Sequence, residues 1–168
     1  LKTDFHNAFN EAEPQAFLPV AARRMPGSAR LAHWCYGEPA SLVYNGRVFQ
    51  PSRGQQGCPV MMPLFCAMKK EMRDRVLDTE RRERDRDGAS GLPDLSFAAD
   101  YADDGVYGGD CETVLRVLKE EMTVASEYGL RFNFSKMVVY PLAGDAFAGA
   151  LSGCCARGRN VDRNGSLM

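Results

Sequence analysis

Two adjacent acidic residues, Asp103 and Asp104, lie between two short β-prone stretches, residues 95–99 and 106–107. Asp and Gly are common turn residues, so the five-residue segment that starts at Tyr101 predicts a β-hairpin with the acidic pair at its bend. Successive strand side chains point to opposite faces, so both carboxylates reach one point only if the turn brings them together. Taken alone, the same segment also describes an ordinary turn with no chemistry.

The remaining secondary-structure signals describe a mixed chain of helices and strands. Asn45-Gly46 between two β-prone runs is a strong hairpin signal, because both positions of a type I′ turn need positive φ. Apolar spacing, breakers and caps predict further elements: a strand over residues 1–5, helices over 13–24, 28–36 and 111–128, a helix that starts at Pro63, and a returning strand segment over 131–140. This order predicts an α+β fold in which helices pack on one face of an antiparallel sheet.

The run of charges from residue 69 to residue 87 continues the helix that starts at Pro63. Acidic and basic side chains are interspersed in it, so we expect a solvated helix face or a mobile loop rather than a nucleic-acid-binding arm. The whole chain has 21 Lys and Arg against 22 Asp and Glu, a formal charge of −1. Free-standing nucleic-acid-binding proteins usually carry a basic excess, so this balance disfavours a complete protein of that class.

No stretch of the sequence predicts a membrane span or a zinc site. The longest apolar run, residues 59–68, is shorter than the ~20 residues that cross a bilayer, and Pro63 interrupts it. The six cysteines form no CxxC pair and have no histidine at ligand spacing. We therefore expect free thiols, an intracellular location in the cytoplasm or nucleus, and no membrane partner.

A third acidic residue, Asp4, ends the apolar strand predicted over residues 1–5. Carboxylates that gather in a partly buried site repel one another unless a cation offsets their charge. Mg²⁺ prefers hard oxygen ligands, and two such ions roughly 3.5–4 Å apart stabilise the attacking and leaving oxygens of a phosphoryl transfer. Asp4, Asp103 and Asp104 are therefore candidate ligands of two Mg²⁺ ions.

Four segments of the chain extend this pattern in a fixed order. They are Asp4-Phe-His-Asn-Ala-Phe9-Asn, Arg53-Gly-Gln-Gln-Gly-Cys-Pro59 followed by Pro63-Leu-Phe65, Tyr101-Ala-Asp-Asp104, and Gly129-Leu130 with Asn133 and Lys136. In this order they resemble motifs A, B, C and D of the reverse transcriptases, especially the non-long-terminal-repeat retrotransposon and group II intron type. Each segment alone has weak to moderate specificity, but the ordered set spans most of the chain.

The resemblance implies RNA-directed DNA polymerase activity, in which the 3′-hydroxyl of a DNA primer attacks a deoxynucleoside triphosphate (dNTP) on an RNA template. Asp4 and Asp103 would be the main ligands of two Mg²⁺ ions and Asp104 a supporting ligand, with Mn²⁺ as an alternative metal. The backbone around Phe5 would touch the triphosphate-bound ion. Lys136 would protonate the pyrophosphate leaving group or neutralise its charge, unless it is a plain surface lysine.

The resemblance also implies substrate contacts. Phe9 would place its ring beneath the incoming sugar and exclude a 2′-hydroxyl, the alternative being a core aromatic. Gln56 would hydrogen-bond the nucleotide or template, and Gly57 would let the backbone approach the nascent base pair. Arg53 would bind phosphate or remain solvated. Asp100 is a departure, because the family generally carries apolar or aromatic residues before motif C, and it would perturb the site or face solvent.

The expected organisation is a polymerase palm over residues 1–142, truncated at its N-terminus, and an irregular segment over 143–168 that leads to the missing palm end and thumb. The expected partners are an RNA template, a DNA primer, dNTPs, and the fingers and thumb of a longer protein. The isolated fragment is expected to be inactive. Two alternatives stay open: an RNA-templated RNA polymerase palm, and an inactive retroelement remnant that binds nucleic acid or protein.

Overall fold

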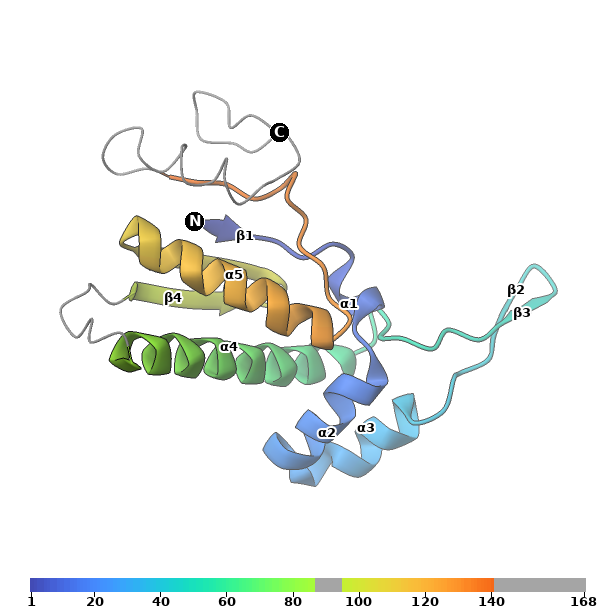
Figure 1. Ribbon diagram of the computed structural model, residues 1–168. Coiled ribbons are helices and arrows are strands. Elements are labelled where there is room, and N and C mark those ends of the chain that lie inside the picture. The colour runs from blue at the N-terminus through green and yellow to red at the C-terminus, as the bar shows by residue number, and fades with distance from the viewer. Residues whose placement is uncertain (87–94, 141–168) are drawn as a thin grey trace.

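The computed structural model describes residues 1–86 and 95–140, which Figure 1 shows as coloured ribbon. Three strands form a small antiparallel sheet in the order β1 (Lys2–Thr3), β5 (Asp104–Gly109), β4 (Leu95–Tyr101). Two long helices, α4 (Met61–Arg86) and α5 (Cys111–Glu127), pack against each other beside this sheet (Figure 1). The expected α+β fold class, with an antiparallel sheet and packed helices, is confirmed.

The two faces of the sheet differ in exposure. In β5, Gly105 and Tyr107 are buried whereas Val106 between them is exposed. Phe97 and Tyr101 of β4 are exposed on the same side as Val106, because alternate residues of a strand share a face. We call the side of Tyr107 the helix face and the side of Val106 the open face.

The segment between β1 and the hairpin of β2 and β3 is helical. It contains α1 (Ala8–Glu11), α2 (Pro14–Arg24), a 3₁₀ turn (Pro26–Ser28) and α3 (Ala29–Tyr36). Proline at the first position of α2 is favourable, because the N–H that it lacks would have no partner within the helix there. α2 packs against α4, and the helices predicted over 13–24 and 28–36 are confirmed to within one residue.

The hairpin predicted around Asn45-Gly46 is confirmed. Strand β2 (Leu42–Tyr44) pairs with β3 (Arg47–Phe49), and both turn residues have positive φ, +49° and +71°. All six strand residues are exposed, and Figure 1 shows the hairpin projecting away from the helices and the sheet.

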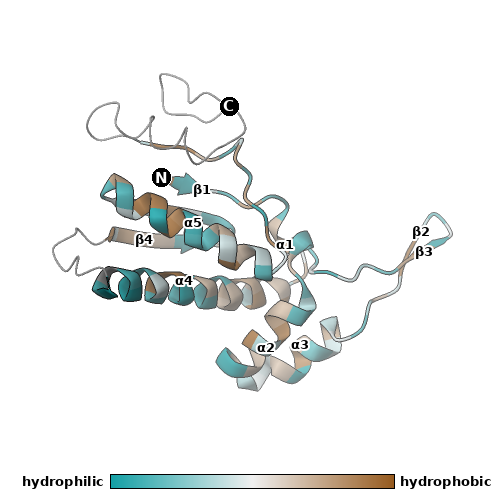
Figure 2. Cartoon of the chain, viewed as in Figure 1, coloured by the Kyte–Doolittle hydropathy of each residue, from teal (hydrophilic) through white to brown (hydrophobic). Residues whose placement is uncertain are grey.

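The charged run is helical rather than a loop, and the solvated helix face that we predicted is confirmed for one side of the helix only. Residues 69–86 continue α4, and Figure 2 shows this helix passing from pale to hydrophilic colours along its length. Lys69, Arg73 and Glu80 are nevertheless buried, with exposed fractions of 2%, 6% and 5%. Their stripe of the helix is buried because α4 packs between α2 and α5. The loop expected from residue 87 to residue 94 lies outside the described residues.

Helix α5 follows its sequence signals. The side chain of Asp110 accepts hydrogen bonds from the N–H groups of Glu112 and Thr113, at 3.0 and 3.1 Å, and so caps the helix. Gly129, with φ of +77°, takes the left-handed conformation just after the helix ends. The helix predicted over 111–128 is confirmed.

The segment after α5 is not the continuous strand that we predicted over residues 131–140. It forms two isolated bridges with the first strand segment, Lys2 to Val138 and Phe5 to Phe132. A turn over residues 134–136 separates the bridges, so the pairing cannot become regular. Residues 141–168, including the segment expected to be irregular, lie outside the described part of the chain.

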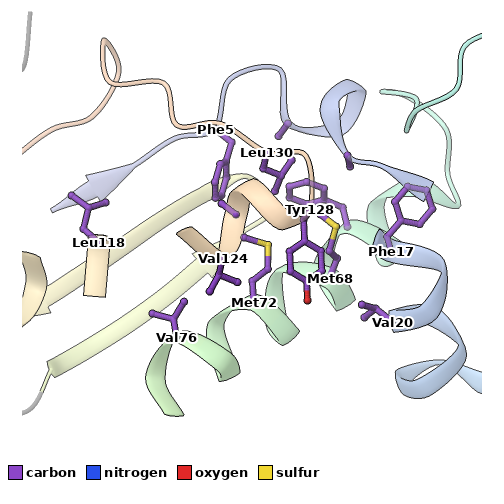
Figure 3. Close-up of a cluster of buried hydrophobic side chains, with 14 of the residues drawn as sticks. Phe5, Phe17, Val20, Met68, Met72, Val76, Leu118, Val124, Tyr128 and Leu130 are labelled. Atoms are coloured by element: carbon purple, nitrogen blue, oxygen red, sulfur yellow. The ribbon is translucent and has the colours of Figure 1, made fainter. Parts of the chain in front are cut away.

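The hydrophobic core extends from the space between the helix face of the sheet and the two long helices to α2, which contributes Phe17 and Val20 (Figure 3). Phe5, Met68, Met72, Leu118 and Val124 converge there from the segment after β1, from α4 and from α5. Full burial of each such side chain contributes roughly 1.5–3 kcal/mol. Within residues 1–86 and 95–140, no helix combines the length and the apolar character that a membrane span requires.

Candidate active site

The acidic pair lies at the bend of the β4–β5 hairpin, as the sequence predicted. Tyr101 pairs with Asp104, so Ala102 and Asp103 form a two-residue loop. Ala102 has φ of +51°, a conformation that costs energy for a residue with a Cβ. Strain of this kind persists only where the surrounding structure imposes it, and here the two-residue hairpin turn does so. Asp103 and Asp104 are both half-buried.

Asp4 is held beside this hairpin by strand pairing. Lys2 pairs with Val106 and Thr3 with Gly105; Asp4 directly follows this paired strand, and Asp104 directly precedes Gly105. The backbone oxygen of Asp4 accepts a 2.8 Å hydrogen bond from the N–H of Asn133. The pairing of β1 with β5 thus sets the segment of Asp4 alongside the β4–β5 hairpin, although Asp4 and Asp104 are 100 positions apart in the chain.

The side chain of Asp4 is buried, with 9% of it exposed. Its Oδ2 atom accepts no hydrogen bond, and the Nζ atom of Lys136 lies 3.4 Å from it. The Nζ atom of Lys2 lies 3.1 Å from Oδ2 of Asp104. Each of these two carboxylates therefore has one lysine as its counter-charge.

The three aspartates are chemically suitable ligands for a divalent metal, since Mg²⁺ and Mn²⁺ prefer carboxylate oxygens. The Oδ2 atom of Asp4 is an acceptor with free capacity. Nowhere in residues 1–86 and 95–140 do three or more His, Cys, Asp or Glu side chains lie close enough together to hold a metal ion. Asp4 follows β1 and the acidic pair lies at the β4–β5 bend, but the three carboxylates are not gathered into a closed ligand cage.

The segment resembling motif B packs on the helix that carries Phe9. The N–H of Gly54 donates to the carbonyl of Ala12 at 2.9 Å, and the N–H of Gln56 donates to Oδ1 of Asn10 at 3.0 Å. Gly57 has φ of +89°, which glycine adopts without penalty. A groove of about 530 Å³ runs along this loop, lined by Asn10, Leu42 and residues 50–56.

Three other predicted residues have partners within the chain. The ring of Phe9 is partly buried and packs on Phe65, with ring centroids 4.7 Å apart. The guanidinium of Arg53 lies 3.5 Å from the carboxylate of Glu13. Phe5 is 1% exposed, so its ring belongs to the core and only its backbone could face a metal-bound triphosphate.

Asp100 neither faces solvent freely nor joins the acidic pair. It lies on the helix face, where Lys69 and Arg73 of α4 pair with it. Burial raises the pKa of Asp100, and the two cations oppose that shift. Burial also raises the pKa of Tyr107 well above its usual value, so its hydroxyl stays protonated and donates to Glu121.

Sequence reasoning missed this buried group beneath the hairpin. The available signal was helical spacing: Lys69 and Arg73 lie one turn apart and follow Phe65, on the same stripe as Met72 and Val76. Alternating charges further along the helix obscured that signal.

Neither a scan against models of protein families nor a search of curated proteins finds a match for this chain. The functional assignment therefore depends on the residues and on their geometry.

Proposed function

We propose that this chain is the palm of an RNA-directed DNA polymerase, which adds deoxynucleotides to a primer 3′-hydroxyl with two Mg²⁺ ions. One observation carries the proposal: the buried Oδ2 atom of Asp4, which accepts no hydrogen bond, belongs to the residue that follows β1, the strand paired with β5 next to the Asp103-Asp104 turn. Leaving a buried acceptor without a hydrogen bond costs roughly 1–3 kcal/mol, and the Lys136 ammonium 3.4 Å away offsets its charge without forming one. An oxygen kept in that state is suited to bind a cation.

In this proposal Asp4 and Asp103 hold the metal ions and Asp104 supports them. When bound, the ions would stabilise the attacking and leaving oxygens of the phosphoryl transfer. Lys136 has an exposed ammonium group 3.4 Å from Asp4, so it can leave that carboxylate once a metal replaces its charge. It would then donate a proton to the departing pyrophosphate or neutralise it.

The motif B loop and Phe9 supply the substrate contacts of the proposal. Because the loop is hydrogen-bonded to Asn10 and Ala12, Gln56 and Gly57 stay next to the helix of Phe9. A ring under the incoming sugar would favour deoxynucleotides over ribonucleotides. An RNA-templated RNA polymerase would need a smaller residue there. If Phe9 selects deoxynucleotides, Phe9→Ala should ease ribonucleotide incorporation.

A second candidate is a palm-like module that binds nucleic acid or protein without turnover. The two lysine–aspartate pairs favour it, because Lys2 and Lys136 already compensate the charges of Asp104 and Asp4. The two candidates differ in one property. The polymerase needs a divalent cation to compete with these lysines, and the binding module does not.

Metal binding to the 168-residue chain is the first test. Mn²⁺ titrated into the protein should broaden the NMR signals of Asp103, Asp104 and their neighbours, and Asp4→Asn should abolish the effect. The second test is primer extension on an RNA template by the chain expressed with its flanking coding sequence. Asp103→Asn should abolish extension there, and unchanged extension would refute the assignment. The isolated chain should show little activity, because fingers and thumb grip the substrates in this family.

A further inference from the structure

Five polar side chains on the helix face of the sheet form what we call the buried charge cluster: Lys69, Arg73, Tyr107 and Glu121 are buried, and the side chain of Asp100, at its edge, is 21% exposed. The Nζ atom of Lys69 lies 2.7 Å from Oε1 of Glu121 and 3.5 Å from Oδ1 of Asp100. The guanidinium of Arg73 pairs with the same Oδ1 atom, and the Tyr107 hydroxyl donates to Glu121. Two cations and two carboxylates compensate each other within the cluster.

Burying these charged groups costs desolvation free energy. Lys69 and Glu121 are 2% and 1% exposed, and desolvation of buried ions often cancels their attraction. Apolar residues of similar size frequently stabilise such positions as well or better. Stability alone therefore does not explain why four charged groups lie between α4, α5 and the sheet.

The position of the cluster explains these four charged groups. Asp100 belongs to β4 and lies three residues before Asp103. Tyr107 belongs to β5 and lies three residues after Asp104. The cluster thus contacts both arms of the hairpin that carries the acidic pair. Arg73 links the arms, because it pairs with Asp100 and stacks 4.5 Å from the ring centroid of Tyr107.

The cluster also contacts the segment that carries Asp4. The ammonium of Lys69 lies 4.2 Å from the ring centroid of Phe5, the residue that follows Asp4. Between the strands there is no spare room, since a Cβ at Gly105 would lie 2.5 Å from Oγ1 of Thr3 and 3.3 Å from Oδ1 of Asp100. The segments are therefore packed tightly, and the cations of α4 lie beneath both of them.

We infer that the buried charge cluster is a positioning device, which sets the separation between Asp4 and the Asp103-Asp104 turn and so tunes the affinity of the site for its metal ions. The inference rests on the proposed function. The five residues touch neither metal nor substrate; they act through Phe5 and the two hairpin strands. Partners behind metal ligands commonly change metal affinity by about 10–100-fold when they are removed.

The test measures Mn²⁺ affinity by electron paramagnetic resonance of the free ion, using the 168-residue chain. Asp100→Asn keeps the shape of the side chain and removes its charge, and it should weaken Mn²⁺ binding by about 10–100-fold. Arg73→Met should have a similar effect, and Arg73→Lys should recover part of it. Because the two residues act through one contact, the double variant should lose less than the sum of the two single losses.

The matched control is Glu71→Gln on the same helix. Glu71 also pairs with two arginines, Arg23 and Arg24, but these belong to α2 and lie outside the cluster. Its replacement should leave Mn²⁺ affinity unchanged. Circular dichroism at the titration temperature verifies that each variant is folded, so a loss of affinity cannot come from unfolding. If Asp100→Asn does not fold, Tyr107→Phe removes one oxygen from the cluster and should weaken Mn²⁺ binding in the same direction.

Two outcomes would overturn the inference, and they are distinguishable. If the unsubstituted chain binds Mn²⁺ in a way that Asp4→Asn abolishes, but the folded Asp100 and Tyr107 variants bind it equally well, the positioning role is refuted and the proposed function stands. If the unsubstituted chain shows no binding that depends on Asp4, both fail.

Discussion

Replacing Lys69 by Met removes a buried ammonium group while keeping a side chain of similar length. Glu121, which is 1% exposed, would lose its 2.7 Å partner and retain only the Tyr107 hydroxyl. Removing one member of a buried ion pair leaves an uncompensated charge and typically costs about 3–5 kcal/mol. A domain has only about 5–15 kcal/mol of total stability, so Lys69→Met should remove a large part of it.

Urea unfolding followed by far-ultraviolet circular dichroism measures this loss. The exposed neighbour provides the control: Lys70 is 64% exposed and pairs with Asp74 one turn away, so Lys70→Met should cost no more than about 0.5 kcal/mol. The double variant of Lys69→Met and Glu121→Gln should cost less than the sum of its single variants, because it leaves neither charge unpaired.

A Lys69→Met variant that loses less than about 1 kcal/mol of unfolding free energy, with an unchanged dependence on urea concentration, would contradict the expected cost of a buried unpaired charge, which is several times larger. Strict additivity of the two single variants would also contradict this expectation. Either result would mean that water or a rearranged neighbour compensates Glu121, and that the cluster is not a closed charge network.

Three further predictions concern the helices and the hairpin. Asp110→Ala removes the cap of α5 and should lower the free energy of unfolding by about 1 kcal/mol in urea. Gly105→Ala should cost roughly 1–3 kcal/mol in the same assay, because its Cβ would lie 2.5 Å from Oγ1 of Thr3. Hydrogen bonds from Arg131 hold the pKa of Glu11 below its usual value. The stability that Glu11 contributes is therefore fully present above the usual pKa of a glutamate, and it is lost as the pH falls through the lowered pKa of the folded state. Glu11→Gln should therefore flatten the acid side of a pH–stability profile.

Controls separate these effects from general fragility. Gly27→Ala places a Cβ where no atom lies within 4 Å, so it should be close to neutral, and a large loss there would undermine the argument for Gly105. An Asp110→Ala variant as stable as the unsubstituted chain would show that water caps α5 equally well. An unchanged acid limb in Glu11→Gln would mean that other carboxylates dominate acid unfolding.

The locally encoded parts of the fold were predictable. The Asn45-Gly46 turn, the Asp110 cap and the Gly129 stop depend on backbone conformation and hydrogen bonds within a few residues. The acidic turn was predictable for the same reason. The strand over residues 131–140 was not, because its pairing depends on distant residues and on the turn that interrupts it.

The sequence proposes the members of the candidate site but not their geometry. The order of the motifs suggested Asp4, Asp103 and Asp104, and the structure sets Asp4 just after β1 and the acidic pair at the bend of the β4–β5 hairpin. The lysine partners of Asp4 and Asp104 had no sequence signal as pairs, since ion pairs between distant segments form only after the strands are aligned.

The sequence by itself determined the order of helices and turns and the set of acidic residues, because spacing and turn chemistry act over short distances along the chain. Only the tertiary structure decided that β1, which precedes Asp4, pairs with β5 and that Asp100, Lys69 and Arg73 meet beneath the hairpin. Burial is a property of packed elements: the same charged run is solvated on one side of α4 and enclosed on the other, and no local pattern distinguishes the two until α2, α5 and the sheet are in place.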